Sequence, residues 1–217
     1  MRSRFDEQLS ILNKKLIVMG ALCEEIIGIS SDALLNGNSD KLENVKIIGS
    51  EIDRMEEEIE GICLKLLLLE HPVASDLRQI SAALKMITDM ERIGDQAEDI
   101  AEIIGFLNGR TGEECKEIRK MAETAIKMVN DSVDAYVNTD LELARSVYSF
   151  DDIVDDCFLK TKNKLIDMIA ENKTDGEYPL DLLMIAKYIE RIGDHAVNIA
   201  EWVEYSLTGV HKDNNKD

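Results

Sequence analysis

The sequence predicts an all-α protein of six long helices, arranged as two tandem three-helix bundles related by a pseudo-two-fold axis. Proline occurs only twice in 217 residues, and the chain is rich in Leu, Ile, Ala, Glu, Lys and Met, which favour helices. Residues 89–102 also resemble residues 188–201 at a constant offset of 99 positions, which indicates a duplicated unit. The two bundles are therefore expected to span residues 1–108 and 109–217.

Turn-forming segments divide the chain into the six predicted helices. These helices are expected near residues 4–35, 40–70, 73–107, 112–137, 140–171 and 179–207. Capping-box spacing supports three of the starts, namely Asp40 with Glu43, Thr111 with Glu114, and Thr139 with Glu142. Pro72 and Pro179 suit the first turn of a helix, where a missing N–H does no harm.

Apolar residues in the last helix recur at alternating steps of three and four, which is typical of a bundle seam. They are Leu182, Ile185, Ile189, Ile192, Ala196, Ile199 and Val203. Long helices joined by short loops pack as antiparallel neighbours, so consecutive helices are expected to form hairpins.

Charge and composition exclude several classes of protein. The net charge of −19 argues against nucleic acids and anionic membranes, which require a basic surface, and favours a cation or a basic partner. No apolar stretch follows Met1–Phe5 as in a secretory signal, and no run is long enough to span a bilayer. The four cysteines are widely spaced, which favours reduced, buried thiols. They are Cys23, Cys63, Cys115 and Cys157. A cytoplasmic location is expected.

A repeated pentapeptide, Glu-Arg-Ile-Gly-Asp, is the candidate functional motif. It occupies residues 91–95 and 190–194, and its polar positions recur together with its apolar ones, which packing alone does not require. In each copy the two acids are four residues apart, so they project from one helix face. The chain contains no Gly-rich phosphate loop, Ser/His/Asp set or nucleotide fingerprint, so we do not expect an enzyme.

Hairpin geometry brings further acids to the level of this motif. In an antiparallel hairpin, two residues at the same level have residue numbers whose mean is the centre of the turn. This mean is 172.5 for Asp155 with Glu190 and also for Asp151 with Asp194, and position 172.5 lies at a predicted turn. In the first half, the mean position of Asp53 and Glu91 is 72, which is the predicted turn at Pro72. The residue at the level of Asp95 by the same rule is Gly49, which has no carboxylate. The sequence thus predicts four level carboxylates in the second half and three in the first. Glu98, Glu102 and Glu201 extend the acidic stripe.

Two interpretations of these acids remain open. Clustered carboxylates repel one another unless a cation neutralises them or water screens them. All-oxygen ligands suit iron, magnesium, manganese or calcium better than they suit a thiolate zinc site. Alternatively, the acids form solvated faces on which Arg92 and Arg191 pair with neighbouring carboxylates. His195 either adds a nitrogen ligand or only covers the site.

The two Glu-Arg-Ile-Gly-Asp segments, residues 71–78 and the acids Asp151 and Asp155 resemble the PhoU family of phosphate-specific transport accessory proteins. The resemblance covers nearly the whole chain, and it implies a cytoplasmic, all-helical and often dimeric protein. It also implies a negative regulator that acts between the ABC-type phosphate transporter and a sensor histidine kinase.

The resemblance further implies metal binding by the acidic motifs. The corresponding residues here are Asp53, Glu91 and Asp95 in the first half, and Asp151, Asp155, Glu190 and Asp194 in the second. The expected metal ion is iron, zinc, manganese or magnesium. Because Gly49 stands where an acid is expected, we expect a weaker first-half site. The rival hypotheses are a metal-dependent helical-bundle enzyme, which usually needs histidine ligands, and a structural adaptor whose acids contact a basic partner.

Overall fold

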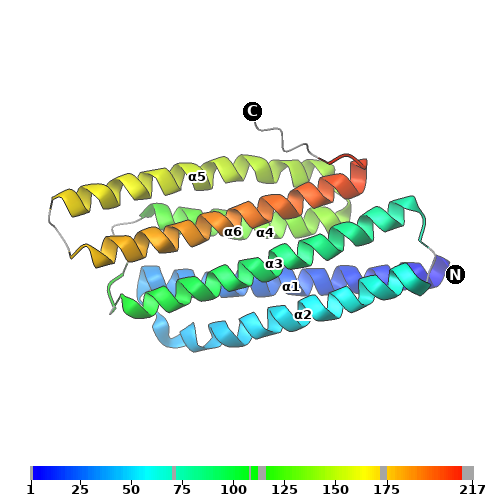
Figure 1. Ribbon diagram of the computed structural model, residues 1–217, viewed down its shortest axis with the longest axis horizontal. Helices are drawn as coiled ribbons and strands as arrows, with labels where there is room; N and C mark the ends of the chain where they lie inside the picture. The colour runs from blue at the N-terminus through cyan, green and yellow to red at the C-terminus, as the bar shows by residue number, and fades with distance from the viewer. Residues whose placement is uncertain (1, 70–71, 108, 112–115, 172–174, 212–217) are drawn as a thin grey trace.

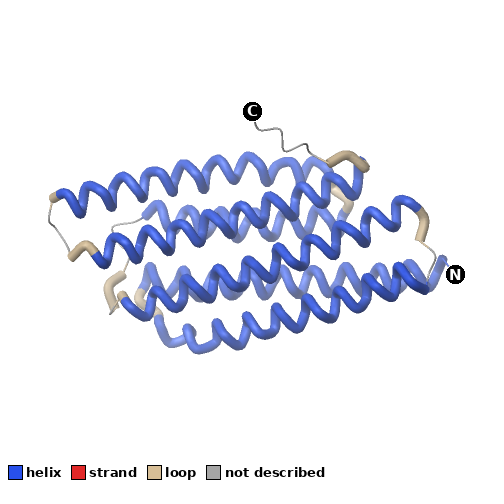
Figure 2. Tube along the Cα trace, in the orientation of Figure 1, coloured by secondary structure: helices blue, strands red, loops and turns tan. Residues whose placement is uncertain are grey.

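The computed structural model describes residues 2–69, 72–107, 109–111, 116–171 and 175–211. Within these residues all regular structure is helical, which confirms the predicted fold class (Figure 2). The long helices are α1 (Arg2–Asn36), α2 (Leu42–Leu69), α3 (Ala74–Phe106), α4 (Lys116–Asn138), α5 (Leu141–Ala170) and α6 (Glu177–Thr208). A short 3-10 turn, η1 (Ser39–Lys41), precedes α2.

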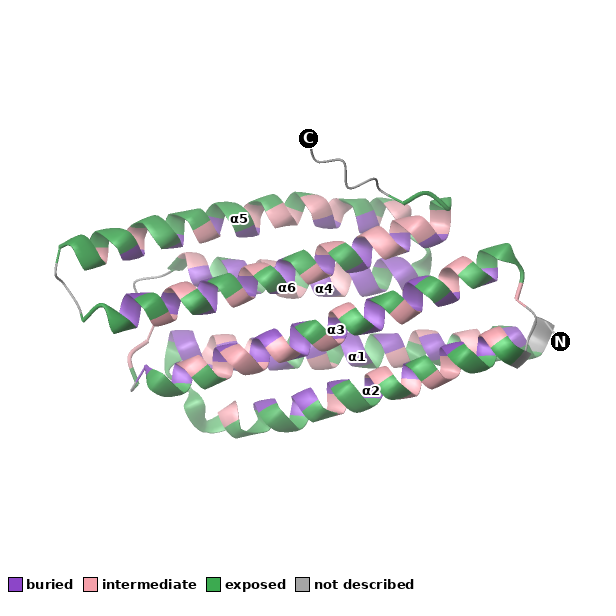
Figure 3. Cartoon of the chain, in the orientation of Figure 1, coloured by how far each residue is buried: buried purple, intermediate pink, exposed green. Residues whose placement is uncertain are grey.

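The helices pack as two groups of three that meet along α3 and α6 (Figure 1). Each of α1, α2 and α3 contacts the other two, and the same holds for α4, α5 and α6. Helices α3 and α6 lie side by side in opposite directions, and α1 packs against α4. Helices α2 and α5 therefore lie at the outer edges, with mostly exposed outward faces (Figure 3).

The contact between α3 and α6 follows the sequence repeat. Asn198 Nδ2 donates to Asp89 Oδ1 at 3.1 Å, and the Tyr188 hydroxyl bonds to the Asp99 carboxylate. A shift of 99 positions converts Asp89 to Tyr188 and Asp99 to Asn198. Replacing each residue by its counterpart in the other half therefore converts one hydrogen bond into the other. A pseudo-two-fold axis between α3 and α6 requires this relation.

The predicted seam of α6 is confirmed, because all seven of its residues are buried. Cys23, Cys63 and Cys157 are free and buried, as predicted, whereas Cys115 lies outside the described residues.

Two predicted capping boxes are wrong. Thr139 has a φ of 54°, so it closes α4 in the left-handed region, and Asp140 caps α5 by accepting from Leu143 N–H at 3.0 Å. Asp40 lies inside η1, so it does not cap α2. The third box includes Glu114, which lies outside the described residues.

The two prolines differ in position. Pro179 is in the first turn of α6, as expected, but Pro72 precedes Val73, the N-cap residue of α3. The Asp76 carboxylate accepts from Val73 N–H at 3.1 Å and stabilises that start.

The glycine of each repeated motif lies where an outer helix packs closely against a central one. A Cβ on Gly94 would lie 3.1 Å from Ile52 Cδ1 on α2, and a Cβ on Gly193 would lie 3.7 Å from Val154 Cγ1 on α5. Ile52 and Val154 correspond in the two halves, because α2 and α5 are offset by 102 positions. Gly94 therefore allows the close approach of α2, whereas a Cβ on Gly193 would be in ordinary van der Waals contact with α5.

We predict that Gly94→Val lowers the free energy of unfolding by about 1–3 kcal/mol, because two added methyl groups overpack the contact with Ile52. Gly105→Ala is the control, since a Cβ there meets nothing within 4 Å and alanine favours the helix by up to about 1 kcal/mol. Urea unfolding of both variants measures the difference. Equal stability of the two variants would contradict this role for Gly94.

Candidate functional site

The candidate site consists of two sets of carboxylates, one on the α2–α3 hairpin and one on the α5–α6 hairpin. In the motif of α3, Ile93 and Gly94 are buried whereas Glu91 and Asp95 are partly exposed. In the motif of α6, Ile192 and Gly193 are buried, Glu190 is partly exposed and Asp194 is exposed. Helical periodicity thus directs the acids away from the core while the residues between them anchor the helix.

The second-half acids lie close enough to perturb one another. Burial raises the pKa of Asp151 to about 6, and the carboxylates of Asp155, Asp194, Asp152 and Glu190 contribute to that rise. Burial and then Glu190 also raise the pKa of Asp194. The structure therefore brings together the four acids that the hairpin register predicts.

Asp151 is the strained member of this set. Its Oδ1 is buried without a hydrogen-bond partner among the described residues, and it lies 3.6 Å from where a Cβ of Gly193 would be. The Lys187 ammonium pairs with the neighbouring Glu190 carboxylate. An anionic oxygen that lacks a donor is costly, so this position favours either a proton or a cation.

In the first half, Arg92 partly neutralises the acids. Its Nε lies 3.4 Å from Glu91 Oε2, and its Nη1 lies 3.4 Å from Asp95 Oδ2. Burial and then Asp95 raise the pKa of Glu91, and Glu56 and Asp53 also contribute. Asp53, Glu91 and Asp95 are thus neighbours, and Arg92 forms the pairs expected of a solvated acidic face.

The first half also contains a fourth carboxylate, that of Glu98, which was predicted to extend the acidic stripe but not to lie over Gly49. A Cβ on Gly49 would lie 1.6 Å from Glu98 Oε1, so the Glu98 carboxylate occupies the space of the missing side chain. Burial and then Asp53 and Asp95 raise the pKa of Glu98. A signal for this was available, because the residue matching Glu98 in the second half is Val197, whereas the residue matching Gly49 is Asp151.

The donor types fit a hard or borderline cation, but the side chains are not preassembled around one. Among the described residues, no group of three His, Cys, Asp or Glu side chains is arranged to hold a metal ion. His195 points across to α3, where its Nδ1 lies 2.9 Å from Asp89 Oδ1. The side chains would have to rotate toward a common point to bind a metal.

No described helix is both long and apolar enough to cross a membrane.

Comparison with known proteins decides the family. The PhoU domain model matches residues 16–104 and 118–203. This chain belongs to the PhoU family. Each of the two PhoU segments contains one copy of the repeated motif and one acid set.

Similar PhoU proteins cover the whole chain. A phosphate-specific transport system accessory protein PhoU homolog from Clostridium acetobutylicum is 36% identical over 216 residues, covering 99% of both chains. The homolog from Pseudomonas aeruginosa is 33% identical and covers 95% of this chain and 86% of its own. The crystal structure of PhoU from P. aeruginosa superimposes with a TM-score of 0.89, covering 95% of this chain and 100% of that one at 33% identity.

The phosphate transport system regulatory protein PhoU from Streptococcus pneumoniae gives a TM-score of 0.88 at 25% identity, covering 96% and 99% of the two chains. These likenesses confirm the resemblance and the six-helix PhoU fold predicted from the sequence.

The raised pKa of Asp151 predicts that ionised Asp151 lowers the free energy of unfolding of the metal-free protein in a pH-dependent way. Its carboxyl has a pKa of about 6 when folded and about 3.8 when unfolded, so the native state retains the proton between these values. The unfolding free energy therefore falls as pH rises through this window. Asp151→Asn removes the cost and should stabilise the protein by on the order of 1–2 kcal/mol at pH 7, allowing for solvent screening, but not below pH 4.

Urea unfolding at pH 4 and pH 7 measures this effect. Asp156→Asn, on the same helix, is the control, because Lys160 lowers the pKa of Asp156 and no gain with rising pH is expected. A gain for Asp151→Asn that is equal at both pH values would show that Asp151 is not strained in the charged form.

Proposed function

We propose that this protein is an accessory regulator of phosphate uptake that represses transport and the phosphate-starvation response when phosphate is plentiful. The observation that carries the proposal is similarity over 99% of the chain to a protein described as a phosphate-specific transport system accessory protein. Similarity that includes both halves and both motifs supports a shared role better than a likeness in fold alone.

In this proposal the protein acts in the cytoplasm as a homodimer without catalytic turnover, between the ABC-type phosphate transporter and a sensor histidine kinase. The net charge of −19 supports an adaptor that binds basic protein surfaces. The sequence contains no Gly-rich phosphate loop, Ser/His/Asp set or nucleotide fingerprint, which supports a role without turnover. Sedimentation should give a particle of about twice the 24.4 kDa chain mass.

We further propose that Asp151, Asp155, Glu190 and Asp194 bind a metal ion, and that Asp53, Glu91 and Asp95 form a corresponding, weaker first-half site. Asp151 Oδ1 is buried and has no hydrogen-bond partner in the described part of the chain, which supports this proposal, because a cation would supply the missing partner. Both sites offer oxygen ligands suited to iron, manganese or magnesium, and zinc also accepts carboxylates. A bound ion would neutralise the acids and tie each outer helix to its central neighbour.

Deletion of the gene should leave phosphate uptake and the starvation genes poorly repressed in high phosphate. The proposed regulator is needed for repression, so its loss should leave transport and the starvation genes active. Transcript levels and radiolabelled phosphate uptake measure the effect, and a plasmid copy of the gene is the control. Normal repression in a deletion strain without a second PhoU gene would refute the proposed function.

The double variant Glu190→Gln/Asp194→Asn should lose most of the second-half metal, because amides are weaker ligands than carboxylates. Elemental analysis after loading with iron, zinc, manganese or magnesium measures the metal content. Added metal should raise the melting temperature of the parent but not that of the variant. The matched control is Asp156→Asn/Glu142→Gln, which removes two exposed α5 acids outside the cluster.

If the parent binds no metal, or if the double variant binds as much as the parent, the second-half acids form a solvated face.

A further inference from the structure

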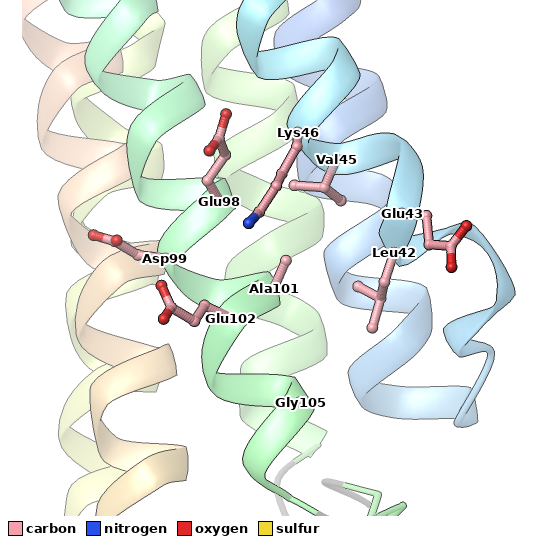
Figure 4. Close-up of a pocket in the computed structure, with 9 residues that line it drawn as sticks. All are labelled: Leu42, Glu43, Val45, Lys46, Glu98, Asp99, Ala101, Glu102 and Gly105. Carbon is pink, nitrogen blue, oxygen red and sulfur yellow. The ribbon is translucent and has the colours of Figure 1, made fainter.

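A groove lies between the start of α2 and the end of α3, beyond the Glu-Arg-Ile-Gly-Asp motif of α3. It encloses about 590 Å³, a volume that can hold a small ligand or a few side chains. Its lining consists of Leu42, Glu43, Val45, Lys46, Glu98, Asp99, Ala101, Glu102 and Gly105 (Figure 4). Apolar residues from both helices thus lie beside several carboxylates and one ammonium group.

The sequence repeat provides an internal comparison for this groove. The 102-residue offset between α2 and α5 and the 99-residue offset between α3 and α6 assign each lining residue a counterpart. The buried Val45 corresponds to the buried Val147, which supports the alignment. Five lining positions differ in chemistry between the halves. Glu98 and Asp99 correspond to Val197 and Asn198, which carry no charge. The other three positions determine how the space between the helices is filled. Glu43, Lys46 and Gly105 correspond to Arg145, Tyr148 and Glu204.

In the second half these three side chains bind one another across the two helices. Arg145 donates to Glu204 Oε1 through Nε at 3.0 Å and through Nη2 at 2.8 Å. The Tyr148 hydroxyl donates to Glu204 Oε2 at 3.0 Å. The chain therefore fills this space with its own guanidinium and phenol groups, which bridge α5 and α6.

The first half lacks this filling. Gly105 has no side chain, and a Cβ there would meet nothing within 4 Å. The Glu43 carboxylate points away from α3, while Lys46 reaches toward α3 (Figure 4). Glu102 is exposed and makes no ion pair or hydrogen bond within the described part of the chain. The groove lined by Val45 and Ala101 is therefore not filled by the side chains at positions 43 and 105.

Its charge and apolar surroundings define a complementary ligand. Glu98, Asp99 and Glu102 line the groove together with the single ammonium group of Lys46. Because carboxylates outnumber cations in this lining, a second cation would be favourable. Leu42, Val45 and Ala101 supply apolar surface within the same lining. Carboxylates next to apolar side chains suit a ligand side chain that has an apolar stem and a cationic end.

We propose that this groove binds an arginine side chain on a basic segment of a partner protein, in the place that Arg145 fills in the second half. Glu98 and Glu102 would accept from the guanidinium, and Leu42 and Ala101 would contact the methylene groups of the arginine stem. The inference gives the proposed regulator a docking surface on its first half, and its biological meaning rests on that proposed function. The binding itself is tested separately on purified protein.

The probe is the acetylated, amidated peptide LKLARSVYSF, which is residues 141–150 of this chain with Glu142 replaced by lysine. Titration into the isotope-labelled full chain should shift the backbone amide signals of Ala101 and Gly105 saturably. Replacing the peptide arginine by citrulline, which is similar in shape but uncharged, should weaken binding at least about five-fold. Added salt should weaken the binding of the arginine peptide more than that of the citrulline peptide.

The variant Glu43→Arg/Lys46→Tyr/Gly105→Glu transfers the second-half filling to the first half and leaves the net charge unchanged. It should melt near the parent temperature and lose the saturable shifts. Glu102→Gln, a single exposed substitution, should weaken binding several-fold without affecting the fold. Glu123→Gln on α4 removes the same charge outside the groove and should bind the peptide as the parent does.

Unchanged binding by the groove-filling variant, or equal binding of the arginine and citrulline peptides, would overturn the inference. If the filling variant does not fold, parent-like binding by Glu102→Gln overturns it instead. Normal phosphate repression in the deletion strain would refute the proposed function while leaving the groove result intact. If the parent does not bind the arginine peptide, the proposed binding in the groove is refuted, whereas the proposed regulatory function is not affected.

Discussion

The antiparallel packing of α3 against α6 is the constraint on which the rest of this structure depends. These two helices carry the repeated motifs and occupy the centre of the molecule, with α2 and α5 at its outer edges. One side of each central helix is occupied by the other half, as the pairs of Asp89 with Asn198 and Asp99 with Tyr188 demonstrate. The motif acids are consequently confined to the side that faces the outer helix, where both acid sets form.

Close approach of the outer helix then determines the electrostatics of each set. Ile52 and Val154 on the outer helices pack beside the motif glycines, and burial raises the pKa of the nearby carboxylates Glu91 and Asp151. Asp151 is the clearest result, since it packs over Gly193 and its Oδ1 has no donor among the described residues. A site that is costly without a proton or a cation can couple ion binding to the rigidity of the hairpin.

The two halves share this framework but have diverged in ways that their pseudo-symmetry makes visible. The first half replaces an acid on the outer helix by Gly49 and supplies Glu98 from the central helix instead. The second half fills its inter-helix space with Arg145, Tyr148 and Glu204, whereas the first half leaves the corresponding groove open. Duplication therefore retained the packing while the surface of each half acquired different chemistry.

The sequence by itself determined the helical class, the six helices and the level at which the acids of each hairpin meet. These properties follow from local periodicity and short turns, which the α6 seam and the matched centres of Asp151–Asp194 and Asp155–Glu190 illustrate. Tertiary structure alone decided that Glu98 lies over Gly49, that Asp151 Oδ1 is buried without a donor among the described residues, and that His195 pairs with Asp89. Each of these depends on how far a side chain reaches toward a neighbouring helix, and a one-dimensional pattern does not specify that distance.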